Sequence, residues 1–229
     1  MIYDGLIVNG DSYSAKYSET LTYANFLGNS LNIPVENIAR VGSNNDRIVR
    51  STIDFLNSCK FSNPLVIIGW SFIRRKEVWY SGSNRKILNN CFDRNSEPQL
   101  KFTTLDFLIE ENEISDFEKS QLLDPNQVHK QLHDFYQNLF LLSNYLEHKK
   151  INYFWYSAAD NTDCFIESFP ALDKLHSVQW VKQHQKIYQL HNFCTKSWAL
   201  INDNEHRTGT GHLSESGHKK FADFIVKHL

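Results

Sequence analysis

The stretch that decides the fold is GLIVNGDSYS, residues 5–14. Its first half is an apolar run typical of a buried strand, and its second half, beginning at Gly10, is a turn. Similar apolar runs recur along the chain and predict three further strands, at 37–41 (NIARV), 65–69 (LVIIG) and 151–156 (INYFWY). Residues 65–69 are too continuously apolar for a half-solvated strand, so we expect this strand at the centre of a parallel sheet.

Segments with helical spacing separate these strands. They lie at 18–31, 44–56, 127–148, part of 173–201, and 215–228. Strands that alternate with helices predict an α/β fold with helices on both faces of a parallel sheet. Ligands bind such sheets beyond the carboxyl ends of the strands. We therefore look for a site at the turns that begin at Gly10, Gly42, Gly69 and Ser157.

Length and composition are those of one ordinary globular domain. The chain has 229 residues, 41% hydrophobic and 22% charged, with a formal net charge of -2. This predicts a single domain over residues 1–229, within which the less periodic residues 72–126 form an insertion or lid with short helices. The charge balance predicts neither a nucleic-acid nor a membrane partner. No apolar run approaches ~20 residues and no signal peptide is evident, so we expect a cytoplasmic protein.

The four cysteines give no sign of a metal or redox site. They are Cys59, Cys91, Cys164 and Cys194, and none forms a CxxC pair. Zinc ribbons and thioredoxin-type sites need such pairs. We expect free thiols, no metal and no organic cofactor.

A serine near the start of the chain and a histidine near its end suggest nucleophilic catalysis. Ser12 follows the first strand, and His212 stands in GHLSESGHKKFA, just before the last helix. A serine hydroxyl needs a base to take its proton, and imidazole has a suitable pKa. Taken alone, Ser12 could cap the following helix and His212 could be an ordinary loop residue.

Together these blocks resemble the GDSL esterases, also called SGNH hydrolases. The resemblance rests on GDSYS, the glycine turn after the second strand, the third strand ending in glycine, and the closing HLSESGHKKFA. It implies a three-layer, flavodoxin-like sandwich of four to five strands. It implies that Ser12 is the nucleophile, that His212 is the general base, and that the N–H groups of Ser12 and Gly42 hold the oxyanion. His218 falls at the family's second, packing histidine, and we expect Asp11 to hold the turn.

Two positions depart from the family pattern. The family ends its third strand with G-x-N-D, where the asparagine donates to the oxyanion, but this chain has Gly69-Trp70-Ser71-Phe72. Ser71 or Asn44 could donate instead, and Asn44 is the preferred candidate. The family's acid precedes the catalytic histidine by three residues, a position held here by Gly209. Asp203 or Glu205 could replace it, or a backbone carbonyl could orient the imidazole of a Ser–His dyad.

Other residues near the strand ends have open interpretations. Gly69-Trp70-Ser71 half resembles a nucleophile elbow, but its second glycine is missing. Trp70 and Ser71 could contact substrate, and aromatic side chains near the third and fourth strands form either a wall for a sugar or acyl group, or part of the core. Arg74 and its neighbour Arg75 could bind an acidic substrate group or pair with nearby acids.

The sequence thus predicts an esterase that works through an acyl-enzyme on a small-molecule or carbohydrate ester. Small acyl groups on carbohydrate are the first expectation. Transfer of the acyl group to an acceptor other than water would use the same residues. The alternative is a non-catalytic carbohydrate-binding module on the same fold, whose site has lost its acid.

Overall fold

The computed structural model describes residues 3–16, 21–73, 75, 77–79, 92–94, 97–104, 127–157, 174–183 and 212–229. Its centre is a four-stranded parallel sheet in the order β2-β1-β3-β7. The strands are β1 (Gly5–Asn9), β2 (Val35–Asn37), β3 (Pro64–Trp70) and β7 (Asn152–Ser157). Every residue of β1 and β3 is buried, as expected for central strands covered on both faces.

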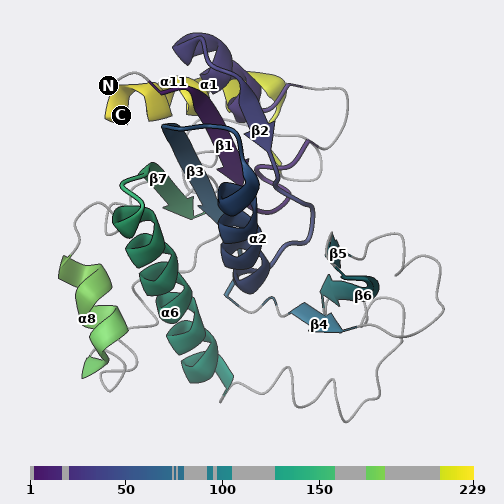
Figure 1. Cartoon of the computed structure of the whole chain (residues 1–229), viewed down its shortest axis with the longest axis vertical. Helices are drawn as coiled ribbons and strands as arrows, with labels where there is room; N and C mark the ends of the chain where they lie inside the picture. The colour runs from purple at the N-terminus through teal and green to yellow at the C-terminus, as the bar shows by residue number, and fades with distance from the viewer. Residues whose placement is uncertain are drawn as a thin grey trace.

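Two pairs of helices cover the sheet (Figure 1). α1 (Tyr23–Leu31) packs against α11 (Glu215–His228), and α2 (Asn45–Ser58) packs against α6 (Gln127–His148). The first pair contacts the sheet through β1 and β2, the second through β3 and β7. The three-layer, flavodoxin-like α/β sandwich predicted from the sequence is therefore confirmed.

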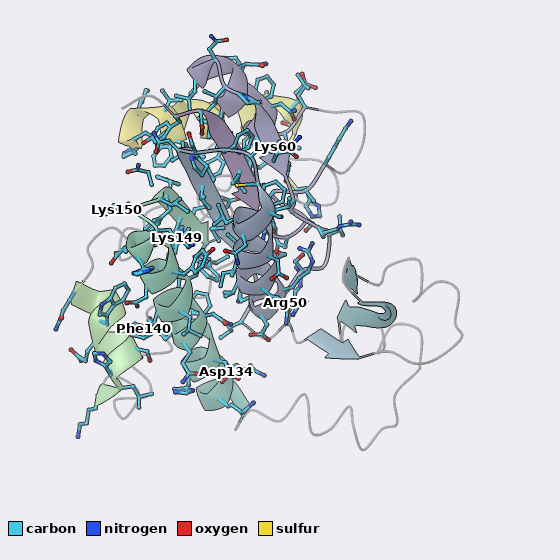
Figure 2. The ribbon with its side chains drawn as sticks, viewed as in Figure 1. Arg50, Lys60, Asp134, Phe140, Lys149 and Lys150 are labelled. Atoms are coloured by element: carbon cyan, nitrogen blue, oxygen red, sulfur yellow. The ribbon has the colours of Figure 1, made fainter. Side chains whose placement is uncertain are left out.

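A further helix, α8 (His176–Gln183), packs on the outer side of α6. Phe140 of α6 makes the contact, with its ring edge-on to His176 and Trp180 at centroid distances of 5.5 and 5.2 Å. Phe140 lies on the side of α6 that faces α8 (Figure 2). No helix within the described residues is both long enough and apolar enough to cross a membrane.

The second strand lies two residues earlier than predicted. β2 is Val35–Asn37 and pairs with β1 in the register Leu6↔Val35, whereas the sequence pattern favoured 37–41. Beyond Asn37 the N–H groups of Ile38 and Arg40 still donate to the Val8 and Gly10 carbonyls, at 2.9 and 3.2 Å, while the Asn37 side chain bonds the backbone around the strand end. Its Oδ1 accepts from the N–H of Ala39 at 3.1 Å, and its Nδ2 donates to the Ser14 carbonyl at 2.8 Å.

The described parts of the 72–126 insertion are strands, not the short helices we predicted. β4 (Glu77–Trp79), β5 (Phe92–Arg94) and β6 (Glu97–Thr104) form a three-stranded antiparallel sheet in the order β4-β6-β5. Aromatic and β-branched residues such as Val78, Phe102 and Thr103 favour extended backbone here. The role of the insertion as a lid stays a prediction.

Candidate active site

The turn after β1 presents Ser12 at the carboxyl edge of the sheet. The Asp11 carbonyl accepts from the N–H groups of Ser14 and Ala15 at 3.0 and 2.9 Å, which curls the chain back over the strand end. Gly10 is needed because a Cβ there would meet the Ser14 hydroxyl and lie 2.9 Å from the Gly69 carbonyl oxygen. The sequence GDSYS therefore folds into a tight turn that leaves the Ser12 side chain only half-buried.

His212 meets Ser12 across 200 positions of sequence. Its Nε2 lies 2.9 Å from the Ser12 hydroxyl oxygen, within hydrogen-bond distance. The Tyr13 ring lies beside the imidazole, with the ring centroids 5.1 Å apart. The contact is the geometry that a general base needs toward the hydroxyl it deprotonates.

An aromatic cluster brings the two ends of the chain together. Phe221 of α11 packs edge-on against Tyr23 of α1 at 5.1 Å and against Tyr156 of β7 at 4.8 Å. His218 stacks on Tyr23 with a centroid distance of 6.1 Å. These buried contacts fix the start of α11 over the sheet. His212, two residues before the Ser214 N-cap of that helix, is thereby placed over the β1 turn.

His218 has the packing role that the resemblance implies. It is buried, and burial, together with the nearby His212, lowers its pKa to about 4. Its Nδ1 is buried and finds no hydrogen-bond partner in the described part of the chain. A neutral imidazole is therefore the stable form of this residue.

The electrostatics of His212 favour its neutral, proton-accepting form. Burial lowers the pKa of His212, the Asp11 carboxylate opposes that shift, and the Arg75 guanidinium adds to it. A neutral imidazole can accept a proton from a serine hydroxyl.

Asp11 is the fully buried centre of a polar network next to Ser12. Its Oδ1 accepts from the Tyr13 N–H at 3.0 Å, which agrees with the expected turn-holding role. Its Oδ2 accepts from the Ser71 hydroxyl at 2.8 Å and from Arg75 Nη1 at 3.0 Å. Burial raises the pKa of Asp11, and Arg75, the Tyr13 N–H, Ser71 and His212 all oppose that rise. On balance the pKa of Asp11 is raised, although the ion pair with Arg75 and the hydrogen bonds from Ser71 and the Tyr13 N–H favour its charged form.

The glycine turn after β2 lies against the β1 turn. The Arg40 N–H donates to the Gly10 carbonyl at 3.2 Å, and the Arg40 carbonyl accepts from the N–H and the hydroxyl of Ser43. Between them, Gly42 has a φ of 75°, in the left-handed region that favours glycine. Among the residues that the structure describes, the backbone N–H groups of Ser12 and Gly42 have no acceptor. They can serve as the oxyanion donors that the resemblance implies.

Asn44 and Asn45 make different contacts at the start of α2. Asn44 is the N-cap: its Oδ1 accepts from the Arg47 N–H at 3.0 Å, and its Nδ2 donates to Asp46 at 3.2 Å. Its amide is thus engaged within the helix cap, and an oxyanion role for Asn44 stays a prediction. Asn45 instead reaches the end of β3, where it accepts from the Ser71 N–H at 2.8 Å and donates to the Ser71 carbonyl at 3.1 Å.

Three buried hydroxyls form a closed triangle behind the turn. Ser14 Oγ lies 2.6 Å from the Tyr156 hydroxyl, the Tyr23 hydroxyl donates to Ser14 at 3.1 Å, and the two tyrosine oxygens are 2.9 Å apart. A side chain at Gly69 would strike the Tyr156 hydroxyl. The triangle joins β1, α1 and β7 beneath the site.

Some predicted site residues lie elsewhere. Trp70 is 0% exposed and packs edge-on against Phe135 and Trp155. Ser71 is also 0% exposed, and its hydroxyl donates to Asp11. A substrate contact by either residue stays a prediction. Trp155 and Tyr156 are buried, which favours the core interpretation of these aromatic residues. Arg74, Asp203 and Glu205 lie outside the described residues.

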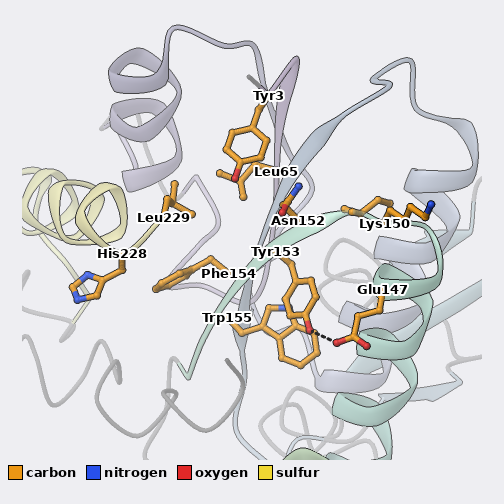
Figure 3. Close-up of a pocket in the computed structure, with 11 residues that line it drawn as sticks. Tyr3, Leu65, Glu147, Lys150, Asn152, Tyr153, Phe154, Trp155, His228 and Leu229 are labelled. Carbon is orange, nitrogen blue, oxygen red and sulfur yellow. Dashed lines mark hydrogen bonds between the residues drawn. The ribbon is translucent and has the colours of Figure 1, made fainter. Parts of the chain in front are cut away.

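A pocket of about 370 Å³ opens at the other end of the sheet (Figure 3). Its lining includes Leu65 and Asn152 near the beginnings of β3 and β7, and the chain end at Leu229. Tyr153 closes one side through a hydrogen bond to Glu147 at 3.1 Å. Since Ser12 and His212 lie at the carboxyl edge, this pocket is separate from the candidate active site. No cluster of three metal-ligating side chains occurs among the described residues.

Sequence reasoning missed Asn45 and the hydroxyl triangle. It took Asn45 for one of several capping residues, because spacing does not reveal which of two adjacent asparagines faces the strand. Ser14 and Tyr156 are 142 positions apart, and nothing local in either segment marks the pair.

Comparison with solved structures identifies the fold. A lipolytic protein of the G-D-S-L family from Desulfitobacterium hafniense superposes with a TM-score of 0.51 and 12% identity, covering 99% of both chains. The psychrotrophic esterase EstA from a Pseudoalteromonas species superposes with a TM-score of 0.49 and 11% identity, covering 98% of this chain and 95% of its own. No protein-family model and no curated protein sequence matches the chain. The fold of this chain is that of the GDSL proteins, the SGNH hydrolase fold.

Proposed function

We propose that the chain is a serine hydrolase that cleaves carboxylic esters through an acyl-enzyme. The observation that carries the proposal is the 2.9 Å contact between Ser12 Oγ and His212 Nε2. Two further observations support it: the lowered pKa of His212, and the backbone N–H groups of Ser12 and Gly42, which have no acceptor among the described residues. The GDSL fold is consistent with this chemistry.

In the proposed first step, Ser12 Oγ bonds to the ester carbonyl carbon as its proton passes to His212 Nε2. The carbonyl oxygen becomes an oxyanion that the N–H groups of Ser12 and Gly42 hold. The bond from carbon to the leaving alkoxy oxygen then breaks, and His212 returns the proton to that oxygen. In the second half, water loses a proton to His212 as its oxygen bonds to the acyl carbon. The bond from that carbon to Ser12 Oγ then breaks, His212 returns the proton to Oγ, and the acid leaves.

The substrate we propose is an ester of a short acyl group, with acylated carbohydrate as the first class to test. The side chains that the structure describes around Ser12 include Tyr13, half-buried next to His212, and Val41, which is 39% exposed beside Gly42. Both can contact an acyl or sugar group. A panel of p-nitrophenyl acetate, butyrate and octanoate, with an acetylated xylo-oligosaccharide, ranks these classes directly.

The deciding experiment combines turnover with covalent labelling. Wild type should hydrolyse p-nitrophenyl acetate. A fluorophosphonate should form one covalent adduct per chain, located at Ser12 by mass spectrometry. Ser12→Ala should abolish labelling and lower kcat by about 10³-fold or more. His212→Gln should lower kcat comparably, and the double variant should cost little more than either single variant.

Ser62→Ala is the matched control, because Ser62 is an exposed serine that hydrogen-bonds Asp4 near the amino ends of the strands. It should retain wild-type turnover and labelling. A wild-type protein that neither turns over nor labels would contradict the proposal and favour the non-catalytic binding module.

A further inference from the structure

A buried ion pair stands directly behind the proposed nucleophile. Asp11, the residue before Ser12, is fully buried, and Arg75 Nη1 lies 3.0 Å from its Oδ2. The same Nη1 donates to the Ser71 hydroxyl at 3.0 Å, and that hydroxyl donates to Asp11 at 2.8 Å. A buried carboxylate is costly unless it is paired and hydrogen-bonded, and this three-membered network gives Asp11 both kinds of partner. Because even a paired buried charge is weak evidence for stability, we ask what else the network does.

The network is built to hold the charge of Asp11 in one place. The Arg75 guanidinium lies over the Phe72 ring at 4.8 Å, and its side chain is only 19% exposed. Asn45 fixes Ser71 by bonding both its N–H and its carbonyl. The Tyr13 N–H holds the second carboxylate oxygen at 3.0 Å, and Tyr13 also packs against His212. One residue therefore links the carboxylate to the imidazole.

We propose that Asp11, held by Arg75 and Ser71, supplies the negative charge that stabilises the His212 imidazolium formed when Ser12 loses its proton. Arg75 is then a positioning residue that acts through Asp11. The inference rests on the proposed function and deepens it. In the family an acid three residues before the histidine has this role, and here that position is Gly209. We assign the electrostatic part of the role to Asp11, which is adjacent to Ser12.

Among the described residues, the other groups around His212 supply no negative charge. In the described part of the chain the charged or titratable groups around it are Asp11 in the β1 turn, Arg75 after β3, and His218 on α11. Arg75 is cationic, and His218 stays neutral above its pKa of about 4. Within this set Asp11 supplies the attraction, and Arg75 has two opposing effects: it pairs with Asp11 and directly repels the imidazolium.

The test is a titration of the His212 ring by NMR, with His212→Gln assigning the signal, and the acid limb of kcat/KM measured in parallel. Asp11→Asn should move the midpoint of the ring titration and the acid limb of kcat/KM to lower pH by about half a unit or more, because a nearby negative charge is lost. Arg75→Gln should move both to higher pH, because its direct repulsion of the imidazolium is lost while the Ser71 hydroxyl and the Tyr13 N–H still hold Asp11. Arg75→Lys should return both toward wild type.

Lys60→Gln is the charge control, because Lys60 is an exposed cation at the opposite end of the sheet (Figure 2). It should leave the titration unchanged. Asp203→Asn and Glu205→Gln test the two alternative acids. Each should shift the His212 ring titration less than Asp11→Asn does. If Asp11→Asn fails to fold, the partly exposed Arg75 carries the test.

A His212 titration that Asp11→Asn and Arg75→Gln leave in place, or that both move in the same direction, overturns the inference. So does a larger shift from Asp203→Asn or Glu205→Gln than from Asp11→Asn. The NMR readout needs no turnover, so a wild-type protein without esterase activity refutes the proposed function while the ring titration still decides the coupling.

Discussion

The Asn45 side chain bonds both the N–H and the carbonyl of Ser71, at 2.8 and 3.1 Å. One amide thereby satisfies the backbone of the first residue after β3, at the point where the chain leaves the sheet. Both residues are buried, with Asn45 6% and Ser71 0% exposed. Since Ser71 in turn holds Asp11, the start of α2 is connected to the turn that carries Ser12.

Asn45→Ala should therefore lower both stability and activity. It leaves the buried Ser71 N–H without its Asn45 partner, which costs about 1–3 kcal/mol of unfolding free energy. Urea denaturation measures the loss. Asn138→Ala is the control, because Asn138 makes an exposed hydrogen bond to Asp46 at 2.7 Å, and it should change the free energy by less than about 0.5 kcal/mol. Equal losses in the two variants would contradict a special role for Asn45.

Asn44→Ser separates capping from oxyanion binding. Serine keeps an acceptor for the Arg47 N–H but has no amide donor. Because the Asn44 amide nitrogen donates to Asp46 in the structure, we expect stability and kcat close to wild type. Asn44→Ala, which loses the cap, should cost about 1 kcal/mol by thermal denaturation. A fall in kcat of about 10²-fold in Asn44→Ser would instead assign the amide to the oxyanion.

Tyr156→Phe tests the hydroxyl triangle. It removes one buried hydroxyl and leaves Ser14 with the Tyr23 hydroxyl, so we expect a loss of about 1 kcal/mol with little change in kcat. Tyr145→Phe is matched to it, because the Tyr145 hydroxyl makes an exposed hydrogen bond to Asn57, and its loss should be smaller. A double-mutant cycle of Tyr156→Phe with Tyr23→Phe should give a coupling free energy distinct from zero.

His218 makes the stability of the fold depend on pH. Burial lowers its pKa in the folded state from 6.5 to about 4. Between those values the unfolded chain binds a proton that the folded chain refuses, so the free energy of unfolding falls as pH drops from about 6.5 toward 4. The full effect is about 3 kcal/mol. Urea titrations across that range should show a shallower pH dependence in His218→Gln, and identical slopes would contradict the assignment.

Gly42→Ala tests the left-handed turn beside the nucleophile. A non-glycine residue at a φ of 75° costs about 1–2 kcal/mol, and relaxation of the turn would move the Gly42 N–H. We expect a lower melting temperature and a lower kcat with KM little changed, because the N–H is used chiefly in the transition state. Gly28→Ala, at a tightly packed glycine of α1 remote from Ser12, should lower stability alone. A kcat loss of the same size in Gly28→Ala would remove the argument for Gly42.

Local chemistry in the sequence was enough for most of the architecture. The continuous apolar runs of β1 and β3 could only be buried strands, and the spacing in 127–148 and 215–228 matches α6 and α11 residue for residue. At the second strand the pattern misled. Where β2 ends, the Asn37 side chain bonds Ala39 and Ser14, and periodicity does not reveal such bonds. In 77–104, short aromatic and β-branched segments gave too little periodicity to indicate a sheet.

The sequence by itself determined that a serine follows the first strand and that a histidine precedes the last helix. Only the tertiary structure decided which groups surround them. Asp11, Ser71 and Arg75 converge because β1 and β3 are neighbours in the sheet, with their carboxyl ends at one edge. His212 reaches Ser12 because Phe221, Tyr23 and Tyr156 pack α11 over that edge. Hydrophobic patterning encodes the elements, but packing between distant elements sets the distances between charges, and those distances decide the chemistry.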